Sequence, residues 1–470
     1  MFRVQTKNTG IITAIISGIL FYFSTGLHQC WPLLWLAPIP VLLYAYHHHY
    51  GSVVVISFFA FLLGKLNYLY YLGSGIPSFF ILSSIIFNAL IFSILVICNK
   101  WLVHKTRHWS AMFLFPALWT SYEFFVSLAS SGNALMSLAY DQLHFLSLIQ
   151  IVSITGIWGA TFTLLTFSSG ISYATYIKNR SYKVISLLFA ILIPLASILY
   201  GHHRLHTPLQ PLDSVSIGLV SINEPHLVYN KKALSLSKQY LPLIKAAAKS
   251  GAQFIVLPEK FIQVTENTYQ KMMPLFQQAA KDNGVTLILG ITRIGQKTFN
   301  KAIIIDPNGK IAGVYNKHYL LPGLENQFTP GKTFFNVQQQ FKWGIAICKD
   351  MDFLPLGHHY GKTNTQLLFV PALDFNFDAW YHARSAIMRG IENGFAIARS
   401  AAHGYLSITD QMGRVIKLAP DFYQKNNVLI GKVTLYRLHT VYTAWGDWFA
   451  WLVFLLLLIA IARAFLCAKR

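Results

Sequence analysis

Charged residues are scarce in this chain, and acidic ones are the scarcest. Only 12% of the 470 residues are charged, with 17 Asp and Glu against 38 Lys and Arg, whereas 54% are hydrophobic. About a quarter of an ordinary soluble globular protein is charged, so the composition excludes that class and indicates a membrane protein with a polar part. The polar part is residues 204–446, which hold 14 of the acidic residues.

Cysteine is also scarce. Three of the four cysteines lie in or beside apolar runs, namely Cys30, Cys98 and Cys467. No disulfide framework can therefore form within the polar part, and the cysteines do not identify the compartment. The fourth, Cys348, ends the apolar run 344–347. A lone thiol at a strand end is either a buried small hydrophobe or a nucleophile.

Signals for nucleic acid and for metal are missing. The chain carries a formal net charge of +21, yet it has no Arg/Lys-rich helix or nucleic-acid motif, so we expect no nucleic-acid partner. The basic excess instead favours attraction to anionic lipid headgroups. The histidine clusters at 47–49, 202–203 and 358–359 have no Cys or carboxylate partners at zinc-site spacing. We therefore expect no metal and no cofactor.

Long apolar runs occupy both ends of the chain. A spanning helix needs about 20 mostly apolar residues. Candidate spans lie at about 9–25, 29–46, 52–72, 77–98, 110–130, 146–177, 184–201 and 447–466. We predict a membrane domain of about seven helices in residues 1–203, an extramembrane domain in 204–446, and a C-terminal helix with a short tail in 447–470.

Basic residues indicate the orientation of these spans. With eight spans, the clusters that contain Arg3, Lys105, Lys183 and Arg470 all fall on one side, and the loops of the other side contain no Lys or Arg. Because positive residues stay on the cytoplasmic side, both termini are predicted to be cytoplasmic and residues 204–446 to lie outside the cytoplasm. A cleaved signal peptide is the alternative for the first span.

The polar part alternates between helical and strand patterns. Predicted strands are 215–220, 254–257, 286–291, 302–305, 311–315, 341–347, 366–370, 394–399 and 405–409, and predicted helices are 233–249, 269–283 and 379–393. Such alternation predicts an α/β domain or an α+β sandwich.

Three chemically versatile residues stand at or just beyond strand ends. They are Glu259, Lys317 and Cys348. Site residues gather at strand ends, where a rigid sheet positions them. A carboxylate can serve as general base to a thiol, and an ammonium can stabilise the oxyanion that forms when a thiolate attacks a carbonyl. The alternative is a buried structural cysteine with two solvated charges.

The motifs around these residues resemble the nitrilase superfamily of carbon–nitrogen hydrolases, and specifically its membrane-embedded branch, the apolipoprotein N-acyltransferase family. The matching segments of the polar part are 251–259, 300–310, 315–323, 344–348, 384–394 and 407–414. Those of the apolar part are 31–37, 116–119 with Glu123, and 446–448. The resemblance covers nearly the whole chain.

The resemblance implies a multi-span α-helical bundle joined to a nitrilase-like αββα sandwich. It implies that Glu259 is the general base, Lys317 the oxyanion stabiliser and Cys348 the nucleophile. Glu325 matches a second glutamate of the family that supports the lysine or the base. The backbone N–H of Lys349 is expected to complete an oxyanion hole.

The implied reaction transfers an acyl chain from a phospholipid, through a Cys thioester, to the N-terminal amine of a diacylglyceryl-cysteine lipoprotein. The expected place is a bacterial inner membrane, with the catalytic domain on the periplasmic side, and the protein is expected to be a monomer. Lys349-Asp350 stands where the family usually has an aromatic and an acidic residue, so substrate contacts are expected to differ there. The alternatives are a membrane-anchored amidase, an acyltransferase with another acceptor, and a silent lipoprotein-binding scaffold.

Overall fold

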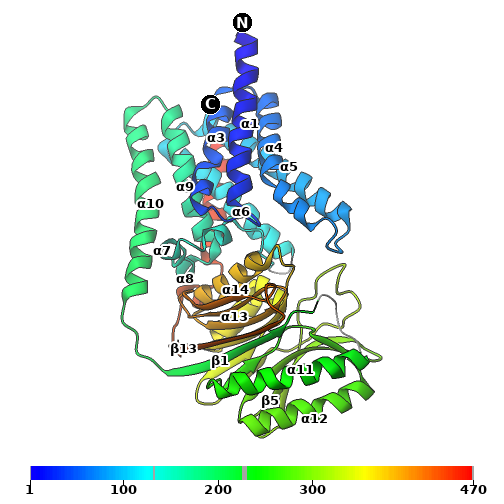
Figure 1. Ribbon diagram of the computed structural model, residues 1–470. Coiled ribbons are helices and arrows are strands. Elements are labelled where there is room, and N and C mark those ends of the chain that lie inside the picture. Colours follow the sequence, from blue (N-terminus) through cyan, green and yellow to red (C-terminus); the bar gives the residue numbers. More distant parts are fainter. Residues whose placement is uncertain (1, 131–132, 225–229, 468–470) are drawn as a thin grey trace. The chain divides into compact units, whose positions relative to one another are not determined.

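The computed structural model describes residues 2–130, 133–224 and 230–467, and the chain divides into two compact units (Figure 1). The helical unit comprises Met1–Thr207 and Trp445–Arg470. The sheet unit is Pro208–Ala444. Each unit is described by itself below.

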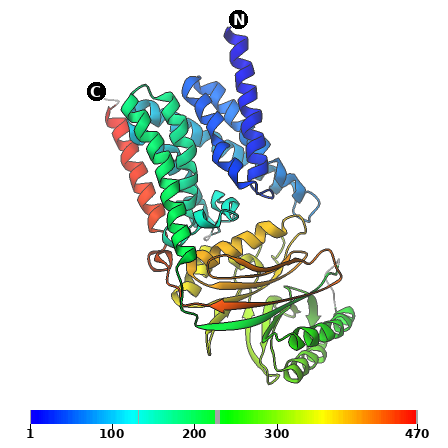
Figure 2. The same ribbon diagram turned by 60° about the vertical axis from the view of Figure 1, so that its left-hand side comes forward.

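The helical unit is built from helices of unequal length. Its long helices are α1 (Phe2–Ser24), α4 (Tyr50–Gly64), α5 (Ser78–Thr106), α6 (Leu114–Ala129), α9 (Ile157–Tyr176), α10 (Arg180–His206) and α16 (Trp448–Cys467). Its short ones are α2 (Trp31–Leu36), α3 (Pro38–His47), η1 (Leu66–Tyr71), η2 (Trp109–Phe113), η3 (Leu138–Gln142), α7 (Leu146–Ile149) and α8 (Val152–Thr155). The C-terminal helix α16, red in Figure 2, packs against α5, α6 and α9, so the two ends of the chain form one bundle.

Four helical segments of the described chain are long and apolar enough to cross a membrane. They are Ser78–Thr106, Trp109–Ala129, Arg180–His206 and Trp448–Leu466. Shorter apolar helices cover Asn8–Ser24, Tyr50–Gly64 and Leu146–Thr155. Their length and composition make this a membrane protein, and the predicted count of eight spans stays a prediction.

Two predicted spans are interrupted in the structure. The run 29–46 is divided into α2 and α3 at Ala37, because Pro38 has no N–H to continue the helix. The run 146–177 is divided at Gly156, whose φ of +65° ends α8 before α9 begins. A hydropathy average depends on side-chain types alone, so it does not detect either of these helix ends.

The sheet unit holds thirteen strands among its described residues. They are β1 (Asp213–Ile222), β2 (Phe254–Val256), β3 (Ile262–Thr265), β4 (Thr286–Ile294), β5 (Phe299–Ile305), β6 (Ile311–Asn316), β7 (Phe335–Gln338), β8 (Lys342–Ile345), β9 (Leu367–Leu373), β10 (Ala396–Ala402), β11 (Tyr405–Thr409), β12 (Val415–Pro420) and β13 (Asn426–Leu435). Its helices are α11 (Asn230–Lys249), α12 (Glu266–Asn283), η4 (Cys348–Asp352), α13 (Leu354–Lys362) and α14 (Ala379–Asn393), and α15 (Val441–Trp445) follows at the unit boundary.

The strands form two sheets that pack face to face. One has the order β13-β1-β2-β4-β5-β6 with β3 beside β4, and the other has the order β12-β11-β10-β9-β8-β7. Helices α11 and α12 cover the first sheet, and α13 and α14 cover the second (Figure 1). The predicted combination of membrane helices with an αββα sandwich is therefore confirmed.

The layers follow from side-chain alternation along the strands. On β4, Leu287, Leu289 and Ile291 pack with the apolar faces of α11 and α12, whereas Ile288 faces the second sheet. Strands β2 and β4 are parallel, and two antiparallel steps through β5 return β6 to the same direction. The carboxyl ends of β2, β4 and β6 therefore lie at one edge of the first sheet.

Candidate active site

The three predicted catalytic residues follow strands of the sheet unit. Glu259 comes three residues after β2, Lys317 comes directly after β6, and Cys348 begins η4 shortly after β8. The backbone N–H of Glu259 donates to Ala372 O of β9 at 3.2 Å, which joins the first sheet to the second at this point.

A buried ion cluster forms where β2 and β6 end. Lys317 Nζ lies 2.8 Å from Glu259 Oε1 and 2.8 Å from Glu325 Oε2. Lys260 Nζ lies 2.7 Å from Glu325 Oε1 and 3.6 Å from Glu259 Oε1. Glu259, Lys317 and Glu325 are each 1–2% exposed. Two ammonium groups thus balance two carboxylates in a site that is closed to bulk water.

Asn300 on β5 holds this cluster together. Its Nδ2 donates to Glu259 Oε1 at 2.6 Å and to Glu325 Oε1 at 3.1 Å. Its backbone oxygen accepts from Lys317 N at 2.8 Å. One strand residue therefore fixes both carboxylates and the backbone of the lysine.

The charges of the cluster outweigh the effect of burial. Burial works to raise the pKa of both glutamates, but Lys260 and Lys317 hold the pKa of Glu259 below its ordinary value and lower that of Glu325 to about 2. Burial works to lower the pKa of Lys317, but the two carboxylates raise it above its ordinary range. All three groups are therefore ionised at neutral pH.

Cys348 occupies a strained and partly exposed turn. Its φ of +43° lies in the left-handed region, which costs a residue with a Cβ on the order of 1–3 kcal/mol. The thiol donates to Leu373 O at 3.4 Å. Within the described residues, no hydrogen bond joins it to Glu259 or Lys317. The turn thus leaves the Cys348 sulfur partly exposed beside the buried ion cluster.

The resting thiol is neutral. Burial and the Glu259 carboxylate raise the pKa of Cys348 above its ordinary value, and Lys317 opposes them only in part. Asp374 and Arg399 also act on this pKa, the first raising and the second lowering it. They form a buried bidentate pair, with contacts of 2.6 and 2.8 Å. A base must therefore remove the proton when the sulfur attacks.

Asp350 ties the cysteine turn to the lysine loop. Its carboxylate accepts from Tyr315 Oη at 2.7 Å, Tyr319 N at 2.8 Å and Ile347 N at 2.9 Å. Burial raises the pKa of Asp350 to about 6 in spite of these donors. Because the donors flank Lys317 on one side and Cys348 on the other, Asp350 sets the position of the two loops relative to each other.

The structure brings some predicted residues together and leaves others apart. Glu259, Lys317 and Glu325 are in direct contact. The Lys349 side chain pairs with Asp352 at 2.8 Å. The role of the Lys349 backbone N–H as an oxyanion donor stays a prediction. Sequence reasoning missed the roles of Asn300, Lys260 and Asp350, although each lies within or beside a quoted motif.

The chemistry open to this arrangement is attack by sulfur on a carbonyl. Glu259 is an ionised carboxylate that can accept the thiol proton, and Lys317 is a fixed cation that can stabilise an oxyanion. The partial exposure of Cys348 gives a carbonyl compound access to the sulfur.

Gly290 on β4 lies directly under Glu259. A Cβ at this position would stand 2.2 Å from Pro258 O and 2.7 Å from Glu259 Cα, and backbone atoms cannot rotate away. We expect Gly290→Ala to lower stability by about 1–3 kcal/mol, as overpacking does, and so to lower the unfolding temperature by roughly 2–12 °C. Gly295→Ala is the matched control, because the nearest atom to its Cβ is 3.6 Å away. Equal shifts in thermal unfolding of the two variants would contradict the close approach.

Known proteins match both units. A family model described as Apolipoprotein N-acyltransferase N-terminal domain matches residues 17–170, and one described as Carbon-nitrogen hydrolase matches residues 228–441. The chain is 24% identical over 477 residues to the apolipoprotein N-acyltransferase of Geobacter metallireducens, and equally to that of Haemophilus influenzae. Each match covers 90% of this chain and 89% of the relative. Among solved structures, an amidase from Nesterenkonia sp. is 16% identical, with a TM-score of 0.42 over 48% of this chain and 93% of that chain.

Proposed function

Because the chain belongs to the apolipoprotein N-acyltransferase family and is an acyltransferase, we propose that it acylates the N-terminal amine of a lipoprotein, with a phospholipid as acyl donor. The observation that carries the proposal is the Lys317 ammonium held at 2.8 Å between Glu259 and Glu325, beside the partly exposed Cys348. The apolar helices of the other unit support a lipid donor, because both substrates can then stay anchored in one bilayer.

The first half-reaction loads the enzyme. The Cys348 thiol turns from Leu373 O toward Glu259, which accepts its proton as sulfur bonds to the carbonyl carbon of a phospholipid ester. Lys317 stabilises the negative charge on the carbonyl oxygen. When the acyl C–O bond breaks, the leaving oxygen takes the proton from Glu259, and a lysophospholipid departs. The acyl chain remains on Cys348 as a thioester.

The second half-reaction unloads it. The amine of a diacylglyceryl-cysteine lipoprotein attacks the thioester carbon, and Glu259 accepts one of its protons. Lys317 again stabilises the oxyanion. The C–S bond then breaks, the sulfur recovers the proton, and an amide is released. We propose that this happens on the periplasmic side of a bacterial inner membrane, that both termini are cytoplasmic and that the enzyme acts as a monomer.

An acyl adduct on Cys348 is the expected result of the first half-reaction. Full-length protein in detergent is mixed with dioleoylphosphatidylethanolamine and no acceptor. The protein is then digested, and the masses of its peptides are measured by mass spectrometry. We expect one oleoyl group on the Cys348 peptide, removable by neutral hydroxylamine as thioesters are. Cys348→Ser should lose the thioester, whereas Cys30→Ser, which removes an exposed thiol of the helical unit, should keep it.

Two outcomes would contradict the proposal. Release of free oleate without an acylated peptide acceptor, once a lipopeptide is added, would favour the amidase-like hydrolase. Full replacement of the wild type in cells by Cys348→Ser would favour a silent scaffold.

A further inference from the structure

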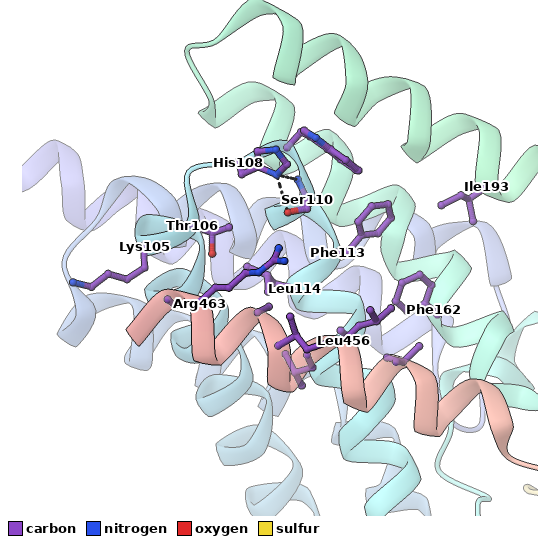
Figure 3. Close-up of a pocket in the computed structure, with 17 residues that line it drawn as sticks. Lys105, Thr106, His108, Ser110, Phe113, Leu114, Phe162, Ile193, Leu456 and Arg463 are labelled. Carbon is purple, nitrogen blue, oxygen red and sulfur yellow. Dashed lines mark hydrogen bonds between the residues drawn. The ribbon is translucent and has the colours of Figure 1, made fainter. Parts of the chain in front are cut away.

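A cavity of about 700 Å³ lies within the helical unit, apart from the site described above. Its walls come from the end of α5 and from η2, α6, α9, α10 and α16, and Figure 3 shows the residues that line it. Such a volume falls within the roughly 300–1,000 Å³ of ligand pockets. The apolar lining residues include Phe113, Leu114, Phe162, Ile193, Leu456 and Leu457.

Among the residues that line the cavity, Lys105 and Arg463 are cationic and none is acidic. Lys105 and Arg463 are both exposed, and no described residue forms an ion pair with either. In Figure 3 the Arg463 side chain extends across the pocket toward Leu114, and His108 and Ser110 lie at the same end. Arg463 therefore places its guanidinium beside these hydrogen-bonding groups, whereas the Lys105 side chain extends away from Arg463 at the rim.

The helical unit has few acidic residues, and none of them lines this cavity. Its three acidic residues are Glu123, Asp141 and Asp447, and none of them lines the cavity. Glu123 accepts from Trp119, Ser137 and Thr161, and Asp447 accepts from Trp158. Among the described residues, no carboxylate therefore lines the cavity beside Lys105 and Arg463.

We propose that this cavity binds an anionic glycerophospholipid, with its phosphate at the Arg463 guanidinium, the exposed Lys105 at the rim adding attraction for the anion, and an acyl chain along the wall that α16 contributes. A free phosphate ion fits only the charged end, whereas the wall and the exposed rim residues Leu456 and Ile459 need an apolar partner. No residue that lines the cavity belongs to the sheet unit. The inference does not rest on the proposed function.

The test compares two lipids with identical chains. Full-length Cys348→Ala protein, which cannot consume the probe, is titrated in detergent with dioleoylphosphatidylglycerol or dioleoylphosphatidylcholine, and bound lipid is counted by native mass spectrometry. We expect the anionic lipid to bind preferentially. Lys105→Gln with Arg463→Gln should weaken it roughly 25-fold, about fivefold per charge, and leave the zwitterionic lipid unchanged.

Two further variants make the result specific. Arg180→Gln with Lys183→Gln removes the same charge from exposed residues at the start of α10 that do not line the cavity, and should leave binding unchanged. Ala460→Trp fills the cavity and should prevent a diazirine-bearing phosphatidylglycerol from labelling α16. Equal loss in both charge variants, no preference for the anionic lipid, or labelling that survives Ala460→Trp would each overturn the proposal in favour of general surface attraction.

Discussion

Glu259→Gln is expected to abolish acyl transfer and, in the same protein, to make the Cys348 thiol more reactive toward iodoacetamide. The two effects differ in sign because the carboxylate has two influences. As general base it contributes about 10²–10⁴ to the acylation rate, which the amide cannot supply. As a nearby negative charge it raises the pKa of the thiol, so its loss lowers that pKa and increases the thiolate fraction at pH 8.

The measurement follows both rates across pH. In the wild type, acylation should fall steeply as the pH drops below the ordinary glutamate value of 4.5, where Glu259 becomes protonated. That acid limb should vanish in Glu259→Gln. Glu266→Gln, which removes an exposed carboxylate of α12, is the control and should change neither rate. A parallel fall of acylation and alkylation would mean that Glu259 acts only by holding the turn in place.

Lys317→Gln is expected to damage both stability and catalysis. Its removal leaves two buried carboxylates with Lys260 alone, and breaking a buried ion pair in this way costs about 3–5 kcal/mol. The lost oxyanion contact should lower the acylation rate by a further 10²–10³, the usual effect of removing one such donor. Thermal unfolding and the rate of thioester formation measure the two effects separately.

A double variant separates the structural effect from the catalytic one. Lys317→Gln with Glu325→Gln removes one charge of each sign, so the remaining pair of Glu259 and Lys260 is balanced. We expect it to recover part of the stability that Lys317→Gln loses, with no recovery of acylation. Recovery of the rate along with the stability would assign Lys317 to folding alone.

Much of the sheet unit could be predicted because its signals are local. Apolar runs that end at Glu259 and Cys348 mark strands of the inner layers, and parallel strands end at the same edge. Strand β13 was not predicted, because its residue types do not follow its burial: Asn427 and Gly431 are buried, whereas Val428 is exposed. Its place beside β1 depends on a pairing across more than 200 residues.

The supporting residues of the site could not be predicted for a related reason. Asn300 looks like an ordinary polar strand residue, and only the fold shows that its side chain meets two carboxylates from separate loops. Asp350 looks like part of a departure from the family pattern, yet its contacts are mostly backbone N–H groups brought together by tertiary structure. Gly290 carries no signal beyond its lack of a side chain.

The pairing of β1 with β13 has a mechanical consequence. Asp213, near the start of the sheet unit, stands opposite Leu435, and the ladder runs on from there to Ile222 and Asn426. The chain after Leu435 is held a second time before the unit ends, because Thr440 donates to Glu392 O of α14 and Tyr442 lies against His358 of α13. The incoming chain is therefore held by β1 alone, whereas the outgoing chain is held by β13 and again by the helices that cover the second sheet. Force on the outgoing chain has to break the contacts of Thr440 and Tyr442 before it can peel β13 from β1.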